Sequence, residues 1–120
     1  MKRIKEKILD DAFSLYVRTK ANFTCKRCGL YVAPPTNRIQ NSHFYTRNAR
    51  STRFDEDNCD ALCVGCHRFL EIRKQGEYTD WKKKQLGTTR FNALRRRYYT
   101  LRPRPPTEEE KLAMLESWKL

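Results

Sequence analysis

The sequence predicts a small α+β domain that is held together by metal-bound cysteines. Four of its five cysteines form two Cys-x-x-Cys pairs, Cys25/Cys28 and Cys63/Cys66. Apolar residues recur at helical spacing on both sides of this region, and the segment between the pairs contains runs short enough for strands. A chain of 120 residues buries a limited share of its surface, so we expect the metal to add stability.

We expect an N-terminal helical arm over residues 1–22, a zinc-stapled core over 23–76 and a basic helical extension over 77–120. In the arm, an apolar stripe at helical spacing predicts an amphipathic helix over 4–18. The stripe consists of Ile4, Ile8, Ala12, Leu15 and Tyr16, and Leu9 and Phe13 broaden it. One face of this helix should pack on the core while the other meets water.

Within the core, glycine follows the second cysteine at position 29, where a tight metal-binding turn needs a permissive backbone. Pro34 and Pro35 indicate a loop over 33–37. We then predict a first strand over 39–45, a second short strand over 53–55, and a helix over 61–74 with Asp60 as its N-cap.

The extension should contain a helix that begins at Thr79 and stops at Gly87, and another over 91–101. Prolines make the segment 102–106 extended. Thr107 and Glu110 fit a capping box that begins a last amphipathic helix, expected to pack on the domain or on a second copy of the chain.

Charge points to a polyanionic partner. The chain has 26 Lys and Arg against 14 Asp and Glu, for a net charge of +12. Nucleic acid is the commonest partner of such a protein, although a ribosome-associated role, an anionic membrane surface or solubility alone would also suit the charge. No apolar run approaches the roughly 20 residues that span a bilayer, and no secretory signal begins the chain. We therefore expect a cytoplasmic protein.

The paired cysteines are typical of structural zinc. Each pair presents two thiolates from one turn, and two pairs fill the tetrahedral shell and leave no position for water or substrate. In a reducing compartment this spacing favours metal over disulfides. The fifth cysteine, Cys59, is interpreted as a small buried side chain.

The two histidines of the chain, His43 and His67, lie close to these cysteines, and Asn58 lies between them. Taken singly, each is commonly structural. The relevant segments are Asn41-Ser42-His43-Phe44, Arg53-Phe54-Asp55-Glu56-Asp57-Asn58-Cys59 and Leu62-Cys63-Val64-Gly65-Cys66-His67. Together they resemble the HNH endonucleases, and they are most similar to the zinc-bearing phage recombination nucleases of the NinG or Rap type. The resemblance covers residues 23–74.

The resemblance implies a ββα-metal (His-Me finger) core and DNA phosphodiester hydrolysis in a bacterial or phage-infected cell. His43 would be the general base, because the pKa of histidine leaves a neutral fraction at physiological pH. Asn58 would hold the loop or the His43 ring, and His67 would bind a catalytic Mg²⁺ or Mn²⁺ at the scissile phosphate.

One position departs from the family pattern. Many members carry Asp or His directly before the catalytic histidine as a metal ligand, whereas this chain has Ser42. His67 could instead share the ion with Glu71, one helical turn away, although Glu71 is equally interpretable as a solvated helix residue. The run 55–57 offers carboxylates that could act through water, or that simply favour a helix N-terminus.

Basic residues are expected to bind DNA phosphates with low sequence specificity. One active site per chain favours cutting of a single strand, unless two chains form a homodimer. The residues concerned are Arg47, Arg50, Arg53, Arg90, Arg95, Arg96 and Arg97. Two alternatives remain: a non-catalytic zinc-ribbon module that binds DNA or RNA, and an RNA-associated structural protein.

Overall fold

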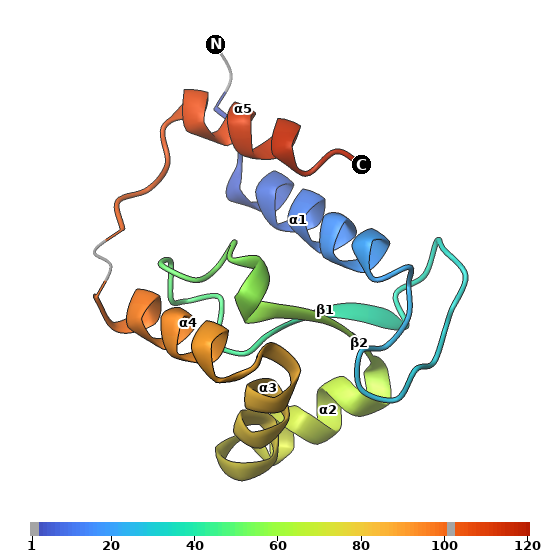
Figure 1. Ribbon diagram of the computed structural model, residues 1–120. Coiled ribbons are helices and arrows are strands. Elements are labelled where there is room, and N and C mark those ends of the chain that lie inside the picture. The colour runs from blue at the N-terminus through green and yellow to red at the C-terminus, as the bar shows by residue number, and fades with distance from the viewer. Residues whose placement is uncertain (1–2, 101–102) are drawn as a thin grey trace.

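The computed structural model describes residues 3–100 and 103–120 (Figure 1). In chain order the elements are α1 (Glu6–Lys20), β1 (Ile39–His43), the 3₁₀ turn η1 (Glu56–Asn58), β2 (Cys59–Cys63), α2 (Val64–Ile72), the π-helical turn η2 (Lys74–Tyr78), α3 (Thr79–Leu86), α4 (Thr88–Thr100) and α5 (Glu108–Ser117). The predicted helix end at Leu101 and the extended Arg102 lie outside the described residues.

The two strands form one antiparallel pair in which Ile39 lies opposite Cys63 and His43 opposite Cys59. Helix α1 contacts both strands from one side, and α2 contacts both from the other (Figure 1). The sheet is therefore covered on both faces, which gives an α+β fold as predicted.

The second strand and the start of the following helix differ from the sequence prediction. Residues 53–55 form no strand; 51–54 are a turn, and the strand is Cys59–Cys63. Helix α2 begins at Val64 with Cys63 as its N-cap, so Asp60 lies within β2 and caps nothing. All five residues of β2 are buried, so the strand lacks the alternation of polar and apolar residues that would have identified it.

Other helix signals are confirmed. Helix α3 begins at Thr79, and Gly87 ends it with a φ of 84° that favours glycine. The capping box of Thr107 and Glu110 is present at the start of α5. Helix α4 begins three residues earlier than predicted, at Thr88. Within 3–100 and 103–120, no helix has both the length and the apolar character needed to cross a membrane.

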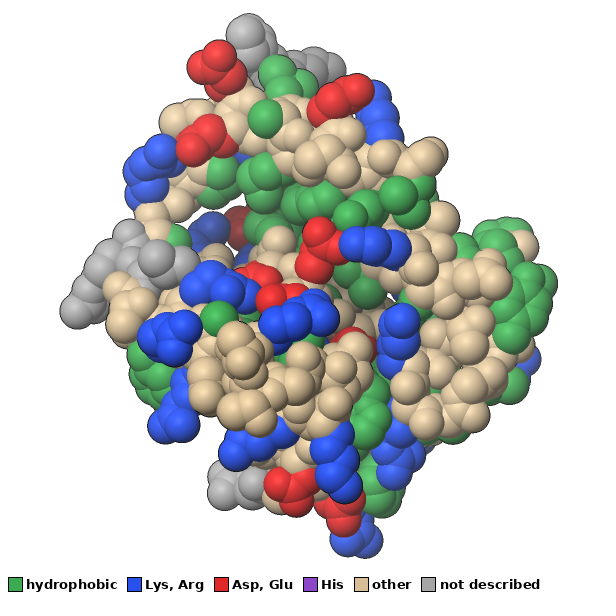
Figure 2. Space-filling view, in the orientation of Figure 1, with side chains coloured by type: hydrophobic (Ala, Val, Ile, Leu, Met, Phe, Trp, Pro, Cys, Tyr) green, Lys and Arg blue, Asp and Glu red, His purple; other side chains and the backbone are tan. Residues whose placement is uncertain are grey.

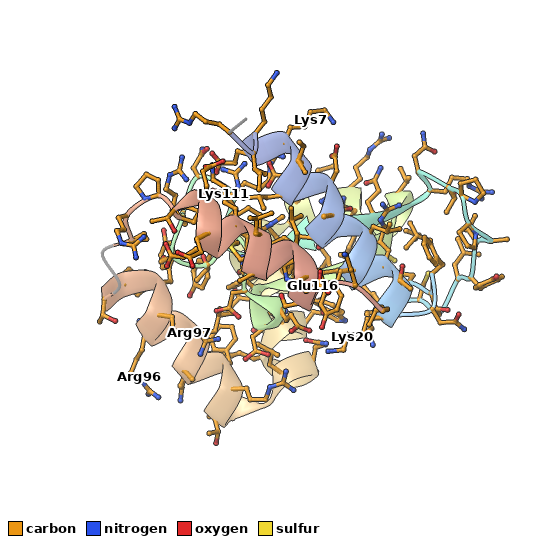
Figure 3. The ribbon with its side chains drawn as sticks, turned by 90° about the horizontal axis from the view of Figure 1, so that it is seen from above. Lys7, Lys20, Arg96, Arg97, Lys111 and Glu116 are labelled. Atoms are coloured by element: carbon orange, nitrogen blue, oxygen red, sulfur yellow. The ribbon has the colours of Figure 1, made fainter. Side chains whose placement is uncertain are left out.

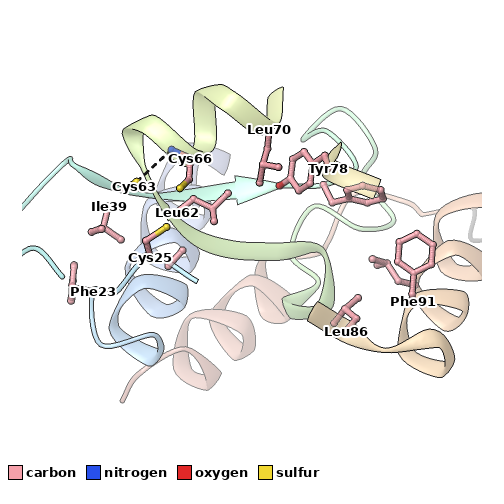
Figure 4. Close-up of a cluster of buried hydrophobic side chains, with 13 residues drawn as sticks. Phe23, Cys25, Ile39, Leu62, Cys63, Cys66, Leu70, Tyr78, Leu86 and Phe91 are labelled. Atoms are coloured by element: carbon pink, nitrogen blue, oxygen red, sulfur yellow. Dashed lines mark hydrogen bonds between the residues drawn. The ribbon is translucent and has the colours of Figure 1, made fainter. Parts of the chain in front are cut away.

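The hydrophobic core extends over all three predicted parts of the chain. Its main cluster joins Cys25, both strands and α2 to Tyr78, Leu86, Phe91 and Leu94 (Figure 4). In a second cluster, the ring of Phe13 on α1 packs against Trp118, with centroids 5.0 Å apart. Helix α5 thus packs on α1 of its own chain, one of the two placements considered for it.

A buried ion pair joins α3 to β2. The Lys82 Nζ donates to Asp60 Oδ2 at 2.6 Å, and both side chains are almost fully buried. Burial raises the pKa of Asp60, opposed by the neighbouring Lys82 charge. Asp60 therefore holds α3 against the sheet instead of starting α2.

We expect Lys82→Met to lower the free energy of unfolding by about 3 kcal/mol, because it leaves the Asp60 carboxylate buried without its partner. Urea denaturation would measure the change. Lys84→Met, at an exposed position of the same helix, is the matched control and should change stability by less than about 0.5 kcal/mol. Equal effects of the two substitutions would contradict a role for the pair.

Candidate functional site

The four paired cysteines come together as predicted. Their sulfur atoms all lie within 4.8 Å of one another, and the Sγ atoms of Cys28 and Cys63 are 3.7 Å apart. Two thiolates of a tetrahedral zinc ion would be separated by roughly 3.8 Å, given the usual Zn–S distance. The cluster therefore fits a metal ion, plausibly zinc, with four protein ligands.

Two local structures present these sulfurs. The first pair lies in a tight turn, where Gly29 has a φ of 82° and its N–H donates to the Cys25 carbonyl. The Lys26 N–H donates to the Ala61 carbonyl at 2.8 Å and so attaches this turn to β2. The second pair begins α2, where the Cys63 Sγ accepts from the Cys66 N–H (Figure 4).

The electrostatics of the cluster favour a bound cation. Burial opposes ionisation of Cys25, but backbone N–H groups of Cys28, Cys63 and Arg27 outweigh it and lower its pKa to about 7. Burial raises the pKa of Cys66 to about 12, opposed by a hydrogen bond from Arg27 and reinforced by the neighbouring sulfurs. Four thiolates at this spacing need a positive ion among them.

Cys59 lies apart from this cluster. Its side chain is buried and packs with Phe13 and Val17, and burial raises its pKa well above the usual value. The interpretation of Cys59 as a small buried residue is confirmed.

The two histidines line one pocket. This pocket, of about 450 Å³, lies between α1, β1 and α2 and is bordered by His43, His67, Glu71 and Asn41. Asp10 and Asp11 of α1 border it as well, and Arg47 lies at its edge, 3.8 Å from the Asp10 carboxylate. The Oδ1 atom of Asn41 is buried without a hydrogen-bond partner in the described part of the chain.

The His43 ring is oriented by the backbone. Its Nε2 lies 2.9 Å from the carbonyl oxygen of Arg53. A carbonyl only accepts, so Nε2 carries the proton, and Nδ1 has the basic lone pair. Burial lowers the pKa of His43, partly offset by this hydrogen bond. The ring is therefore neutral at neutral pH and able to take up a proton.

If His43 is the base of a hydrolytic reaction, activity should persist below pH 6.5, the usual pKa of histidine. Burial disfavours the imidazolium form, so the lowered pKa keeps the base unprotonated in mildly acidic solution. Cleavage rates measured from pH 5 to 8 at saturating metal would show the acidic limb. An acidic limb of the pH–rate profile centred above pH 6.5 would contradict a lowered pKa of His43.

The geometry of His67 suits a metal ligand. The Gln40 side chain donates through its amide nitrogen to the Asn37 carbonyl, and its Oε1 lies 2.8 Å from Nδ1 of His67. Nδ1 therefore donates, and Nε2 lies 3.0 Å from Glu71 Oε1. A carboxylate only accepts, so this contact needs a proton on Nε2 or a metal ion in its place, and an oriented second nitrogen is typical of metal-bound histidine.

Gln40 was not predicted from the sequence, because its role depends on strand β1 lying beside α2.

Ser42 does not lie where a ligand of the catalytic metal was expected. Its side chain is buried and hydrogen-bonds to the Tyr78 hydroxyl, on the opposite face of β1 from His43. Successive strand residues point to opposite faces, so Ser42 faces away from the pocket and is no metal ligand there.

Asn58 fastens the loop rather than the His43 ring. Its side chain is buried, accepts from the Tyr45 N–H and donates to the carbonyls of Tyr45 and Thr52. These three bonds close the segment that runs from β1 to η1. Of the two tasks expected for Asn58, the structure shows the first.

The three carboxylates of residues 55–57 do not border the pocket. Asp55 caps the three-residue turn η1 by accepting from the Asp57 N–H. The helix N-terminus that these charges were expected to favour is not beside them, because β2 follows η1 and α2 begins only at Val64. Asp55 and Asp57 pair with Arg97, and Glu56 pairs with Lys20.

Several predicted phosphate-binding arginines are engaged within the molecule. Arg53 is paired with Asp10 and Arg97 with Asp55, so neither guanidinium faces solvent freely. Arg50 pairs with Glu6, and Arg90 with Asp57. By contrast, Arg95 and Arg96 are exposed on α4, where Arg96 points away from the molecule (Figure 3). Figure 2 shows further Lys and Arg side chains over α3 and α4.

No protein-family model matches this chain, and no curated protein or solved structure shows a significant similarity to it.

Proposed function

We propose that this chain is a metal-dependent HNH endonuclease that nicks DNA, with β1, β2 and α2 as a ββα-metal core. One observation carries the proposal: the basic Nδ1 of a neutral His43 belongs to a ring that borders the same pocket as the His67–Glu71 pair. Hydrolysis of a phosphodiester needs a base for water and positive charge near the phosphate, and this pocket offers residues for both.

In the proposed reaction, Nδ1 of His43 takes a proton from a water molecule while the water oxygen attacks phosphorus. The bond between phosphorus and the 3′ oxygen breaks, leaving a 5′ phosphate and a 3′ oxygen that takes a proton from solvent to become a hydroxyl. Asn58 keeps the loop closed, so that the Arg53 carbonyl stays beside Nε2 of His43. Mg²⁺ or Mn²⁺, held by His67 and Glu71, would neutralise charge on the phosphate and the leaving oxygen.

The zinc in this proposal is structural. Cys63 ends β2, and Cys66 lies one residue before His67 on α2. A metal bound by the cluster would therefore fix the position of α2 relative to β2. Exposed Arg95 and Arg96 on α4 support a polyanion such as DNA as the substrate, because they are available to contact phosphates.

A non-catalytic nucleic-acid-binding module is the second candidate. The burial of Ser42 favours it, because a cation in the pocket would have only His67 and Glu71 among the predicted side-chain ligands. An ion with few protein ligands is bound weakly, and a protein without it would still bind phosphates.

Supercoiled plasmid distinguishes the two candidates. We expect wild-type protein to convert it to the open circular form with Mn²⁺ or Mg²⁺, and EDTA to stop the reaction. Retained plasmid binding with no nicking at millimolar concentrations of either metal would favour the binding module. Loss of zinc should be monitored in the same samples, so that unfolding by EDTA is not taken for loss of catalysis.

A further inference from the structure

Helix α1 is joined to the loop between the strands by a two-point ion pair. The Arg53 Nε donates to Asp10 Oδ1 at 3.0 Å, and Nη2 donates to Asp10 Oδ2 at 2.6 Å. Both side chains are mostly buried, with 17% and 16% of their surface exposed. A charge-assisted pair with two parallel hydrogen bonds fixes the angle as well as the distance between its partners.

The same arginine carries the carbonyl that orients His43. Its backbone oxygen accepts from Nε2 of the ring at 2.9 Å, while its side chain is held by α1. The Arg53 Nη1 also donates to the Arg47 carbonyl and pairs with Glu6. A continuous set of contacts thus runs from Asp10 through Arg53 to the imidazole.

Arg53 needs such support because its neighbourhood is irregular. Residues 51–54 form a turn that lies outside the strand pairing, so no sheet hydrogen bond fixes the Arg53 carbonyl. The Asn58 amide holds the loop at Thr52, one residue earlier, and the next turn bond joins the Asp55 N–H to Thr52. The guanidinium provides the anchor at position 53 itself.

We infer that Asp10 of α1 is a positioning residue: through its two-point pair with Arg53 it fixes the carbonyl that selects the Nε2-protonated form of His43. Its catalytic meaning rests on the proposed nuclease function. The structural part of the inference does not, because the protonated nitrogen of His43 is measurable in a protein that cuts nothing. Asp10 also borders the pocket, and its charge partly offsets the burial that lowers the pKa of His43, but the choice of protonated nitrogen is assigned to its pair with Arg53.

Asp10→Asn tests the inference with little change in size. An asparagine keeps one acceptor oxygen but turns an NH₂ group toward the guanidinium, so the two-point pair is lost. Asp11→Asn is the matched control. It removes the same charge from the next residue of α1, which also borders the pocket but is exposed and paired with Lys7 rather than Arg53.

The first readout is nitrogen NMR of protein labelled in its histidines, of which the chain has two. His43→Gln assigns the signals. We expect the wild type and Asp11→Asn to hold the proton on Nε2 at neutral pH, and Asp10→Asn to show a mixture of both neutral forms. The same mixture in Asp11→Asn would assign the effect to charge alone and overturn the inference.

The second readout is plasmid nicking. Asp10→Asn should lower the turnover number by about ten- to hundredfold while changing KM by no more than about twofold, because misdirection of a base affects the chemical step. An unchanged Nε2-protonated His43 in Asp10→Asn would overturn the inference, whatever the nicking rate. A mixed His43 signal in a protein whose wild type never nicks would uphold the positioning and refute the nuclease.

Folding is controlled by zinc content and circular dichroism. If Asp10→Asn loses its zinc, Arg53→Lys replaces it, since lysine keeps the positive charge but cannot make two parallel hydrogen bonds. We expect the same mixture of His43 forms in that variant, and a wild-type spectrum would overturn the inference.

Discussion

His43→Ala should reduce plasmid nicking by about 10²- to 10⁴-fold while leaving DNA affinity within about twofold of the wild type. The substitution removes the proton acceptor that general base catalysis requires, and a positioned base is commonly responsible for a rate effect of this size. It removes no cationic side chain, and phosphate contacts dominate affinity for DNA. Nicking under single-turnover conditions, together with fluorescence anisotropy at fixed salt, would measure both quantities.

Two further variants make this result interpretable. His67→Ala should shift the Mn²⁺ concentration needed for half-maximal nicking upward, which a lost metal ligand predicts and a lost base does not. Arg96→Ala should weaken DNA binding and leave the rate at saturating protein nearly unchanged, because Arg96 is exposed on α4. Parallel losses of rate and affinity in His43→Ala would indicate a structural histidine and would count against the proposed function.

Cys63→Ser should lose the zinc and most of the thermal stability together. A structural zinc contributes roughly 10–16 kcal/mol in small zinc domains, which equals or exceeds the roughly 5–15 kcal/mol that stabilises a typical domain. The change also replaces the sulfur that accepts from the Cys66 N–H at the start of α2. Zinc content by atomic absorption and thermal unfolding by circular dichroism would test this expectation.

Cys59→Ala is the matched control for Cys63→Ser. Cys59 is also buried and lies at the other end of β2, but its sulfur is outside the group of four. We expect one zinc ion per chain in this variant and a loss of stability near 1 kcal/mol, as for removal of a small buried side chain. An unchanged zinc stoichiometry in Cys63→Ser would mean that the ligand set is wrong.

Periodic and capped segments were predictable from the sequence. The helical spacing in α1, the stop at Gly87 and the capping box at Thr107 are local signals, and each corresponds to an element of the structure. The buried face of α1 was not predicted correctly, because the helix buries Leu9, Phe13 and Val17 and leaves Ile8 and Leu15 exposed. The cysteine cluster was equally accessible, because the spacing within each pair is set by the geometry of one turn.

Strand β2 was not predictable in the same way. Its five residues are buried between α1 and α2, so its pattern is continuous rather than alternating and resembles the start of a helix. Asp60 increased the ambiguity, since an aspartate before an apolar run commonly caps a helix. Its actual partner, Lys82, is 22 residues away and appears only when α3 packs on the sheet.

Long-range pairing also explains what was missed at the candidate site. The two-point pair of Asp10 and Arg53 joins residues that are 43 positions apart, and the hydrogen bond between Gln40 and His67 joins residues that are 27 positions apart. Nothing in the local sequence distinguishes Asp10 from Asp11, or Arg53 from Arg50. Only the packing of α1 and α2 against the strands selects one residue of each kind.

The four cysteines differ in exposure, which has a consequence for how long a bound metal would stay in place. Cys28 is exposed, whereas Cys25, Cys63 and Cys66 are buried. A chelator or an oxidant would therefore reach the ion from the Cys28 side first, detaching one thiolate before the others. Exchange of a bound ion is thus expected to begin at the turn that carries Cys28, before the strands open.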